Sequence, residues 1–214
     1  MHNKNAYTQS VVTNPRKGRL VMMRLAVTAL VFFGMLMPAS VLATIVYHIP
    51  THQMAQESDV IVHAEVESQS VQWSDDRRRI LTLTTLKTIQ SIKGPTNRKR
   101  FTIYQVGGTL DGITYNIPGA LRFQAGEEII FFGMRHQNSL VSYGMGLGKF
   151  KIRSDGPFPV VIPEYGDVQF VKREQGQLSP MARPQPKPIS LGDFIQGIRK
   201  AIGTGSVGGA LDNE

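Results

Sequence analysis

Residues 58–94, SDVIVHAEVESQSVQWSDDRRRILTLTTLKTIQSIKG, decide the fold of this chain. From residue 60 to residue 67 the side chains alternate between two faces, as in a strand with one buried and one wetter side. Residues 74–79 supply turn formers and charge, and a β-prone run rich in Ile, Leu and Thr then extends from residue 80 to residue 92. The stretch therefore predicts a long hairpin. Its buried face comprises Val60, Val62, Ala64 and Val66, and its wetter face Ile61, His63, Glu65 and Glu67.

Three further β-prone runs follow, at residues 101–106, 129–132 and 140–143, and the last of them resumes at 149–153. The second run, IIFF, is wholly apolar and predicts a strand buried on both faces. Together with the hairpin these runs predict a mainly β protein, a small closed OB-like β-barrel with an appended β-hairpin and one C-terminal α-helix. In such a barrel Val62, Ile103 and Phe131 should share one interior.

Glycines are concentrated in two parts of this region. The loop at 107–126 is glycine-rich but has neither the GxxxxGK[ST] spacing nor a following helix, so it does not predict a phosphate site. Gly144, Gly146 and Gly148 leave one face of the chain without side chains. That pattern predicts the close passage of another strand, and the alternative is the floor of a ligand groove.

The character of the sequence changes after residue 154. Residues 157–163 and 168–171 predict the appended hairpin at a sheet edge, which completes a barrel unit at 58–173. Residues 174–189 are interpreted as a proline-rich linker, residues 190–203 as an amphipathic helix that begins with a capping box, and residues 204–214 as a disordered tail.

The first 43 residues resemble a secretory signal peptide. Basic residues precede an apolar core at 25–37, and PASVLA at 38–43 offers small residues before a cleavage site. Cleavage after Ala43 would make Thr44 the new N-terminus and begin an extended segment at 44–57. The alternative is an uncleaved membrane anchor at 20–46, and Met22 or Met23 is an alternative start. The predicted location is periplasmic or secreted.

Charge and cysteine content limit the possible functions. The formal net charge of +8 falls to +3 without residues 1–43, which hold five bases and no acid, so a clustered nucleic-acid surface is not expected. The chain has no cysteine and hence no disulfides or thiolate chemistry. The 171 residues that remain after cleavage suffice for one domain with its own core.

No catalytic, cofactor-binding or metal-binding set is predicted. His48 and His52 have the spacing of metal ligands on a helix, but Pro50 between them favours an extended segment. His63 is interpreted as a surface residue. Trp73, the only tryptophan, either closes the end of the sheet or anchors a partner.

The order and spacing of several motifs resemble a family of uncharacterised exported bacterial proteins. The resemblance covers residues 58–153 and gives no activity. Its motifs are Asp59-Val-Ile-Val, the strand ending at Gly94, Gly107-Gly108, Pro118-Gly119-Ala120 with Phe123, Gly126-Glu127 and Gly148-Lys149-Phe150.

The segment from Thr44 to the strand at 59–62, together with Ile92-Lys93-Gly94, is also similar to the netrin-like module of the tissue inhibitors of metalloproteinases, an OB-type barrel. In those inhibitors the amine and carbonyl of an N-terminal cysteine, held by disulfides, bind the zinc of the protease. The resemblance implies that Thr44 would take that place here, with packing in place of disulfides.

The leading hypothesis is an exported, non-catalytic β-barrel that binds a protein or cell-envelope partner. A metalloprotease inhibitor or companion acting through the N-terminus is one alternative. The other is a hydrolase that uses scattered groups, namely His63, Glu65, Asp111, Glu128 and His136. Thr44, Trp73, Tyr104 and Tyr143 are the candidate partner-binding residues.

Overall fold

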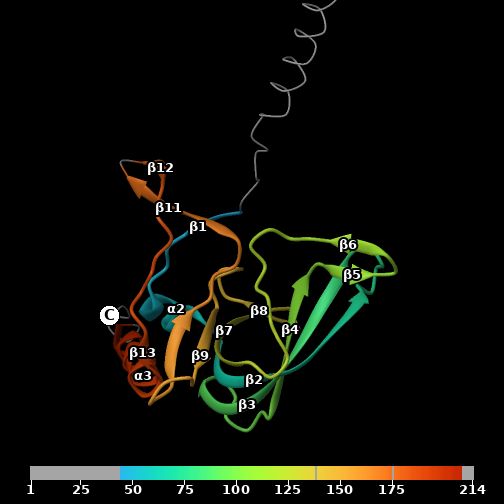
Figure 1. Cartoon of the computed structure of the whole chain (residues 1–214). Coiled ribbons are helices and arrows are strands. Elements are labelled where there is room, and N and C mark those ends of the chain that lie inside the picture. The colour runs from blue at the N-terminus through green and yellow to red at the C-terminus, as the bar shows by residue number, and fades with distance from the viewer. Residues whose placement is uncertain (1–43, 138, 175, 209–214) are drawn as a thin grey trace, which may run out of the picture. The chain divides into compact units, whose positions relative to one another are not determined.

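The computed structural model describes residues 44–137, 139–174 and 176–208. About half of these residues form strands, and two helices accompany them (Figure 1). The strands are β1 (Thr44–Tyr47), β2 (Val60–Trp73), β3 (Ile80–Lys93), β4 (Arg100–Val106), β5 (Gly108–Leu110), β6 (Ile113–Tyr115), β7 (Glu128–His136), β8 (Ser139–Ser142), β9 (Lys149–Arg153), β10 (Val160–Pro163), β11 (Val168–Glu174), β12 (Gln177–Pro180) and β13 (Ile189–Ser190). The helices are α2 (Thr51–Glu57) and α3 (Leu191–Gly208). The predicted mainly β class and C-terminal helix are confirmed.

The predicted hairpin is present as β2 and β3, which pair antiparallel from Ile61↔Lys93 to Trp73↔Ile80. Its turn is held by the Ser74 hydroxyl, which donates to the Asp76 carboxylate at 2.6 Å and accepts from the Arg79 backbone N–H at 3.0 Å. Strand β2 then pairs with β7 on its other side, so the hairpin lies in the middle of the sheet.

Five strands of the large sheet form a ring. Strand β2 pairs with β3, β3 with β4, β4 with β8, β8 with β7, and β7 again with β2. Only the pairing of β4 with β8, at Ile103↔Leu140, is parallel. All five strands contribute to one buried cluster, which we call the ring core. It comprises Val60, Val62, Ala64, Val66, Leu86, Phe101, Ile103, Leu121, Phe123, Ile129, Phe131 and Leu140. The expectation that Val62, Ile103 and Phe131 share an interior is confirmed.

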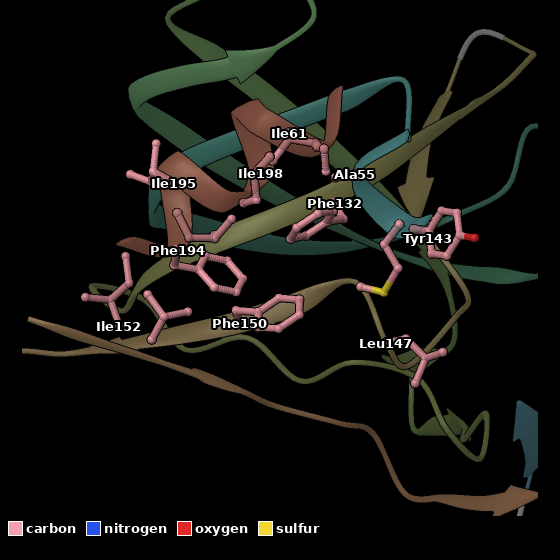
Figure 2. Packing of buried hydrophobic residues seen from close by; sticks show 14 of the residues in the cluster. Ala55, Ile61, Phe132, Tyr143, Leu147, Phe150, Ile152, Phe194, Ile195 and Ile198 are labelled. Atoms are coloured by element: carbon pink, nitrogen blue, oxygen red, sulfur yellow. The ribbon is translucent and has the colours of Figure 1, made fainter. Parts of the chain in front are cut away.

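A second cluster, the outer core, covers the opposite face of β2 and β7. Ile61, Ile130 and Phe132 belong to this cluster together with residues of β9, β10, α2 and α3. Figure 2 shows Ile61 and Phe132 facing Phe150 and Phe194. This layer explains two wrong expectations, because Ile61 is fully buried and His63 is only 7% exposed. The first half of β2 is buried on both faces, whereas a single wetter face was expected.

The strands after residue 154 pair differently from the prediction. The predicted hairpin of 157–163 with 168–171 is wrong, because β10 pairs with β9 and β13. Strand β11 instead pairs antiparallel with β12 and parallel with β1, in a separate three-stranded sheet. The predicted linker therefore contains β12 and runs into β13, and the extended N-terminal segment contains both β1 and α2.

Helix α3 begins as the capping box predicted, because the Ser190 hydroxyl accepts from the Asp193 N–H at 3.2 Å and donates to its carboxylate at 2.6 Å. It continues to Gly208 and does not end at residue 203, so residues 204–208 are helical, contrary to the expected disorder. The rest of the predicted tail and the predicted signal segment, residues 209–214 and 1–43, lie outside the described residues.

Candidate functional site

An apolar pocket of about 430 Å³ lies beside the outer core. Four segments enclose it: the connection from β1 into α2, the sheet strands β9 to β11, the start of α3, and the proline-rich stretch at 182–189, which we call the proline strap. Its volume is in the range of sites that hold small ligands. The lining residues are His48, Ile49, Pro50, Thr51, Met54, Leu147, Phe150, Val161, Pro163, Tyr165, Phe170, Pro184, Gln185, Pro186, Lys187, Ile189 and Phe194.

Aromatic rings form much of the pocket wall. The rings of Phe150 and Phe194 are 5.0 Å apart, so the strand and helix sides of the wall are in contact (Figure 2). On the opposite side the Tyr165 ring meets Phe170 edge-on at 4.9 Å. These separations are typical of stabilising aromatic pairs. The wall is therefore held in shape by packing and does not depend on a ligand.

Backbone hydrogen bonds fix both ends of the proline strap. The Met181 N–H donates to the Phe170 carbonyl at 2.8 Å, and the Leu191 N–H donates to the Pro159 carbonyl at 2.9 Å. Between these points three prolines, at 184, 186 and 188, limit the backbone to extended conformations and lack N–H donors. The strap is thus a stiff rim tied to β11 and to the loop before β10.

The charges around the pocket are positive. No lining residue is acidic, whereas Lys187 lines the pocket from the strap. The Arg183 guanidinium donates to the Gly166 carbonyl at 3.2 Å, beside Tyr165. Burial raises the pKa of Tyr165, and the positive charge of Arg183 opposes that effect. Two acids are next to lining residues in the sequence: Glu164 contacts Lys149 at 3.2 Å, and Asp193 accepts a hydrogen bond from the Ser190 hydroxyl at 2.6 Å.

Lys149 is the centre of a buried ionic cluster on the ring-core side of β9. Its ammonium group is 1% exposed and contacts the Glu127 carboxylate at 2.6 Å and the Arg122 carbonyl at 2.6 Å. It also lies 5.0 Å from the centre of the Phe123 ring. A buried lysine that is this well paired serves as a structural connection between the loop before β7 and β9.

The four predicted partner-binding residues lie on different elements. The Thr44 hydroxyl donates to the Pro118 carbonyl at 2.6 Å. The Trp73 indole donates to Asp111 at 3.1 Å, so this side chain spans from the end of β2 to the β5–β6 turn. Tyr104 is half-buried in β4. No hydrogen bond or ring contact joins any two of the four within the described part of the chain.

Tyr143 is buried in the outer core, and its hydroxyl donates to the Glu57 carboxylate at the end of α2. Burial, followed by this hydrogen bond, raises the pKa of Tyr143 to about 12. Its phenol therefore connects α2 to the segment after β8. A side chain that is 5% exposed offers little surface to a partner.

The predicted catalytic alternatives come together only in part. His63 Nε2 contacts the Glu128 carboxylate across β2 and β7, and Glu65 lies 3.7 Å from Lys87 on β3. Asp111 contacts Trp73, and His136 lies at the far end of β7. The extended segment expected around His48 and His52 is present only up to Pro50, because His52 lies in α2, which begins at Thr51. Among the described residues there is no cluster of three or more potential metal-binding side chains.

Sequence reasoning missed the pocket because its residues are dispersed. The strap was interpreted as a linker, and its proline spacing at 184, 186 and 188 was the one available signal of an ordered extended segment. None of the helices in the described residues has the length and apolarity needed to cross a membrane. Comparison of the chain with protein-family models, curated proteins and solved structures finds no match.

Proposed function

We propose that this protein is an exported, non-catalytic binding module that holds an apolar group of a protein or cell-envelope partner. The observation that carries the proposal is the preformed pocket, which combines an aromatic wall with few polar groups. The rings of Phe150, Phe170 and Phe194 belong to β9, β11 and α3, which pack against the outer core, so binding would not require these rings to be ordered first. The stiff proline strap supports the same conclusion.

The framework of this module is, in our proposal, a small closed OB-type barrel. The ring strands in chain order are β2, β3, β4, β7 and β8, and the ring places the fifth between the third and the fourth. The third and fifth are the parallel pair. This connectivity is typical of five-stranded Greek-key barrels, which recur as binding scaffolds.

A photocrosslinking side chain at position 49, on the pocket wall, tests the proposal in a living bacterium that produces the full chain. We expect a discrete adduct from position 49 and none from position 89, because Ile89 is 54% exposed on β3 and does not line the pocket. Equal adducts at both positions, or none at either, would contradict the proposal. N-terminal sequencing of the same protein should read from Thr44 if it is exported and cleaved.

Catalysis is tested separately with the His63–Glu128 pair, the closest arrangement of possible acid–base groups. The purified protein should show no turnover on a broad panel of hydrolase substrates. Turnover that disappears in Glu128→Gln and persists in Glu174→Gln, an exposed control, would favour a hydrolase instead.

One observation favours a second function, inhibition of a metalloprotease through Thr44. Parallel pairing with β11 and the hydrogen bond to Pro118 hold the 44–47 segment without disulfides. A free amine at Thr44 could then be presented in a fixed position to a metal. One additional glycine before Thr44 should abolish inhibition of a target protease, and equal inhibition by both forms would exclude this mechanism.

A further inference from the structure

The chemistry of the pocket narrows the kind of ligand that it accepts. Its wall is apolar and aromatic, so desolvation favours a hydrocarbon group and disfavours a sugar or a nucleotide. Its one formally charged lining residue is a lysine, and Arg183 lies beside the same wall. Two acids adjoin lining residues without lining the pocket themselves: Glu164 contacts Lys149, and the Asp193 carboxylate accepts a hydrogen bond from Ser190.

We propose that the pocket binds the acyl chain of an amphiphile with an anionic head group, the chain lying among Phe150, Phe170 and Phe194 and the head group at Lys187. This inference rests on the proposed binding function and names the ligand class of the same site. Lys187 is exposed on the strap, so its ammonium group stays solvated while its stem borders the pocket. An anion at the mouth would gain a charge-assisted hydrogen bond without burial of the lysine.

The first experiment measures binding by calorimetry with protein purified after expression of the full chain in a bacterial host. Decanoate, decanol and decyltrimethylammonium share one tail and differ in charge. We expect decanoate to bind about tenfold more tightly than decanol, the ratio expected for one charge-assisted hydrogen bond. The cationic amphiphile should bind most weakly. Equal affinities of decanoate and decanol, or no binding of decanoate, would overturn the proposal.

The length of the tail is a second, independent readout. Affinity should increase about fourfold for each methylene added from hexanoate to decanoate, the factor that corresponds to about 0.8 kcal/mol per buried methylene. An affinity that does not change with tail length would show that the tail stays outside the pocket, and the proposal would then be wrong.

Two kinds of variant locate the ligand. Lys187→Gln should reduce the preference for decanoate over decanol to about one, while decanol binds as before. Lys172→Gln, on β11 outside the pocket lining, should leave the preference unchanged.

Ile49→Trp should abolish binding by filling the pocket, whereas Ile89→Trp should bind normally. If Ile49→Trp does not fold, as judged from its melting temperature, Thr51→Trp fills the same wall. Undiminished binding by a folded blocking variant would overturn the assignment.

The same assay distinguishes two sources of the acyl chain, a free fatty acid and a lipid. Binding of decanoate but not of decanoyl lysophosphatidylglycerol assigns a free fatty acid, and binding of both assigns any single-chain anionic lipid. A partner crosslinked at position 49 without decanoate binding would leave the proposed function standing and refute this inference. Decanoate binding without an adduct at position 49 would support the ligand class and contradict the proposed partner in the cell.

Discussion

The ring core and the outer core lie on opposite faces of β2 and β7 but are built from different parts of the chain. All ring-core residues lie between 60 and 140, and most come from strands that pair directly with each other. The outer core collects residues from 54 to 201, on short strands, two helices and loops. The pocket borders the outer core. Locally paired strands thus provide a rigid support, and segments distant in sequence form the cavity.

Alanine substitutions in the two cores provide the strongest test of this comparison. Phe131→Ala, in the fully buried ring core, should lower the free energy of unfolding by about 3–5 kcal/mol. Phe194→Ala, 8% exposed at the pocket wall, should cost only about 2 kcal/mol, because it enlarges an existing hollow and loses mainly the transfer free energy. Urea denaturation measures both values. Equal losses would mean that the outer core is as tightly packed as the ring.

Removal of the buried lysine of β9, Lys149, should have the next largest effect. Lys149→Met leaves the Glu127 carboxylate, whose side chain is 6% exposed, without its partner and should cost about 3 kcal/mol. Lys172→Met removes the exposed pair with Glu174 at 2.7 Å and should cost less than about 1 kcal/mol. A similar small loss in both variants would show that Lys149 does not connect β9 to the loop before β7.

Substitutions at two glycines, Gly146 and Gly197, test how closely the loop after β8 approaches the loop before β7. A Cβ at Gly146 would overlap the Gly119 carbonyl oxygen, so Gly146→Ala should lower stability by about 1–3 kcal/mol. A Cβ at Gly197, within α3, meets no atom within 4 Å, so Gly197→Ala should raise stability by about 0.5–1 kcal/mol. Thermal unfolding of both variants gives the comparison. Stabilisation by Gly146→Ala would contradict the close approach.

The smallest expected effect depends on pH and concerns the contact between Tyr143 and Glu57. The hydrogen bond from Tyr143, followed by that from Gln53, lowers the pKa of Glu57. Its contribution to stability is therefore present above the ordinary carboxyl pKa of 4.5 and lost as the pH falls through the lower folded-state value. The difference in melting temperature between the wild type and Tyr143→Phe should shrink below pH 4.5. A difference that is constant from pH 7 to pH 3 would contradict this.

At alkaline pH the same contact should lose its contribution to stability as the pH rises, the reverse of the direction at acidic pH. Because the pKa of Tyr143 is raised from 10.0 to about 12, its contribution is complete below pH 10.0 and is lost as the pH rises toward 12. The melting-temperature difference between the wild type and Tyr143→Phe should therefore also decrease over that interval.

The sequence predicted the ring better than its surroundings, for a physical reason. The alternation at 60–66 and the apolar run at 129–132 indicate which side chains face the ring, because successive residues of a strand point to opposite faces of the sheet. The burial of Ile61 and His63 could not be read in this way, since it depends on other elements of the fold. Ile61 packs in the outer core, and His63 contacts Glu128 on β7. The close approach predicted for the glycines at 144–148 is confirmed at Gly146 and Gly148.

The pocket was not predictable for the same reason. Phe150, Phe170 and Phe194 stand in three separate elements, and each has the local pattern of an ordinary core residue. These rings meet only because of which strands pair with each other, and nothing in the sequence of β1 or β11 indicates that the two strands pair. The function proposed for residues such as Thr44 likewise depends on a long-range contact, its bond to Pro118.

The parallel pairing of β1 with β11 also has a consequence for the timing of assembly. The first described strand finds its partner in a segment that leaves the ribosome, or any export channel, only after more than half of the chain has followed. Such contacts of long sequence separation close slowly. The five-strand ring can therefore form before residues 44–47 have paired, and a protease acting in that interval should cut within this segment first.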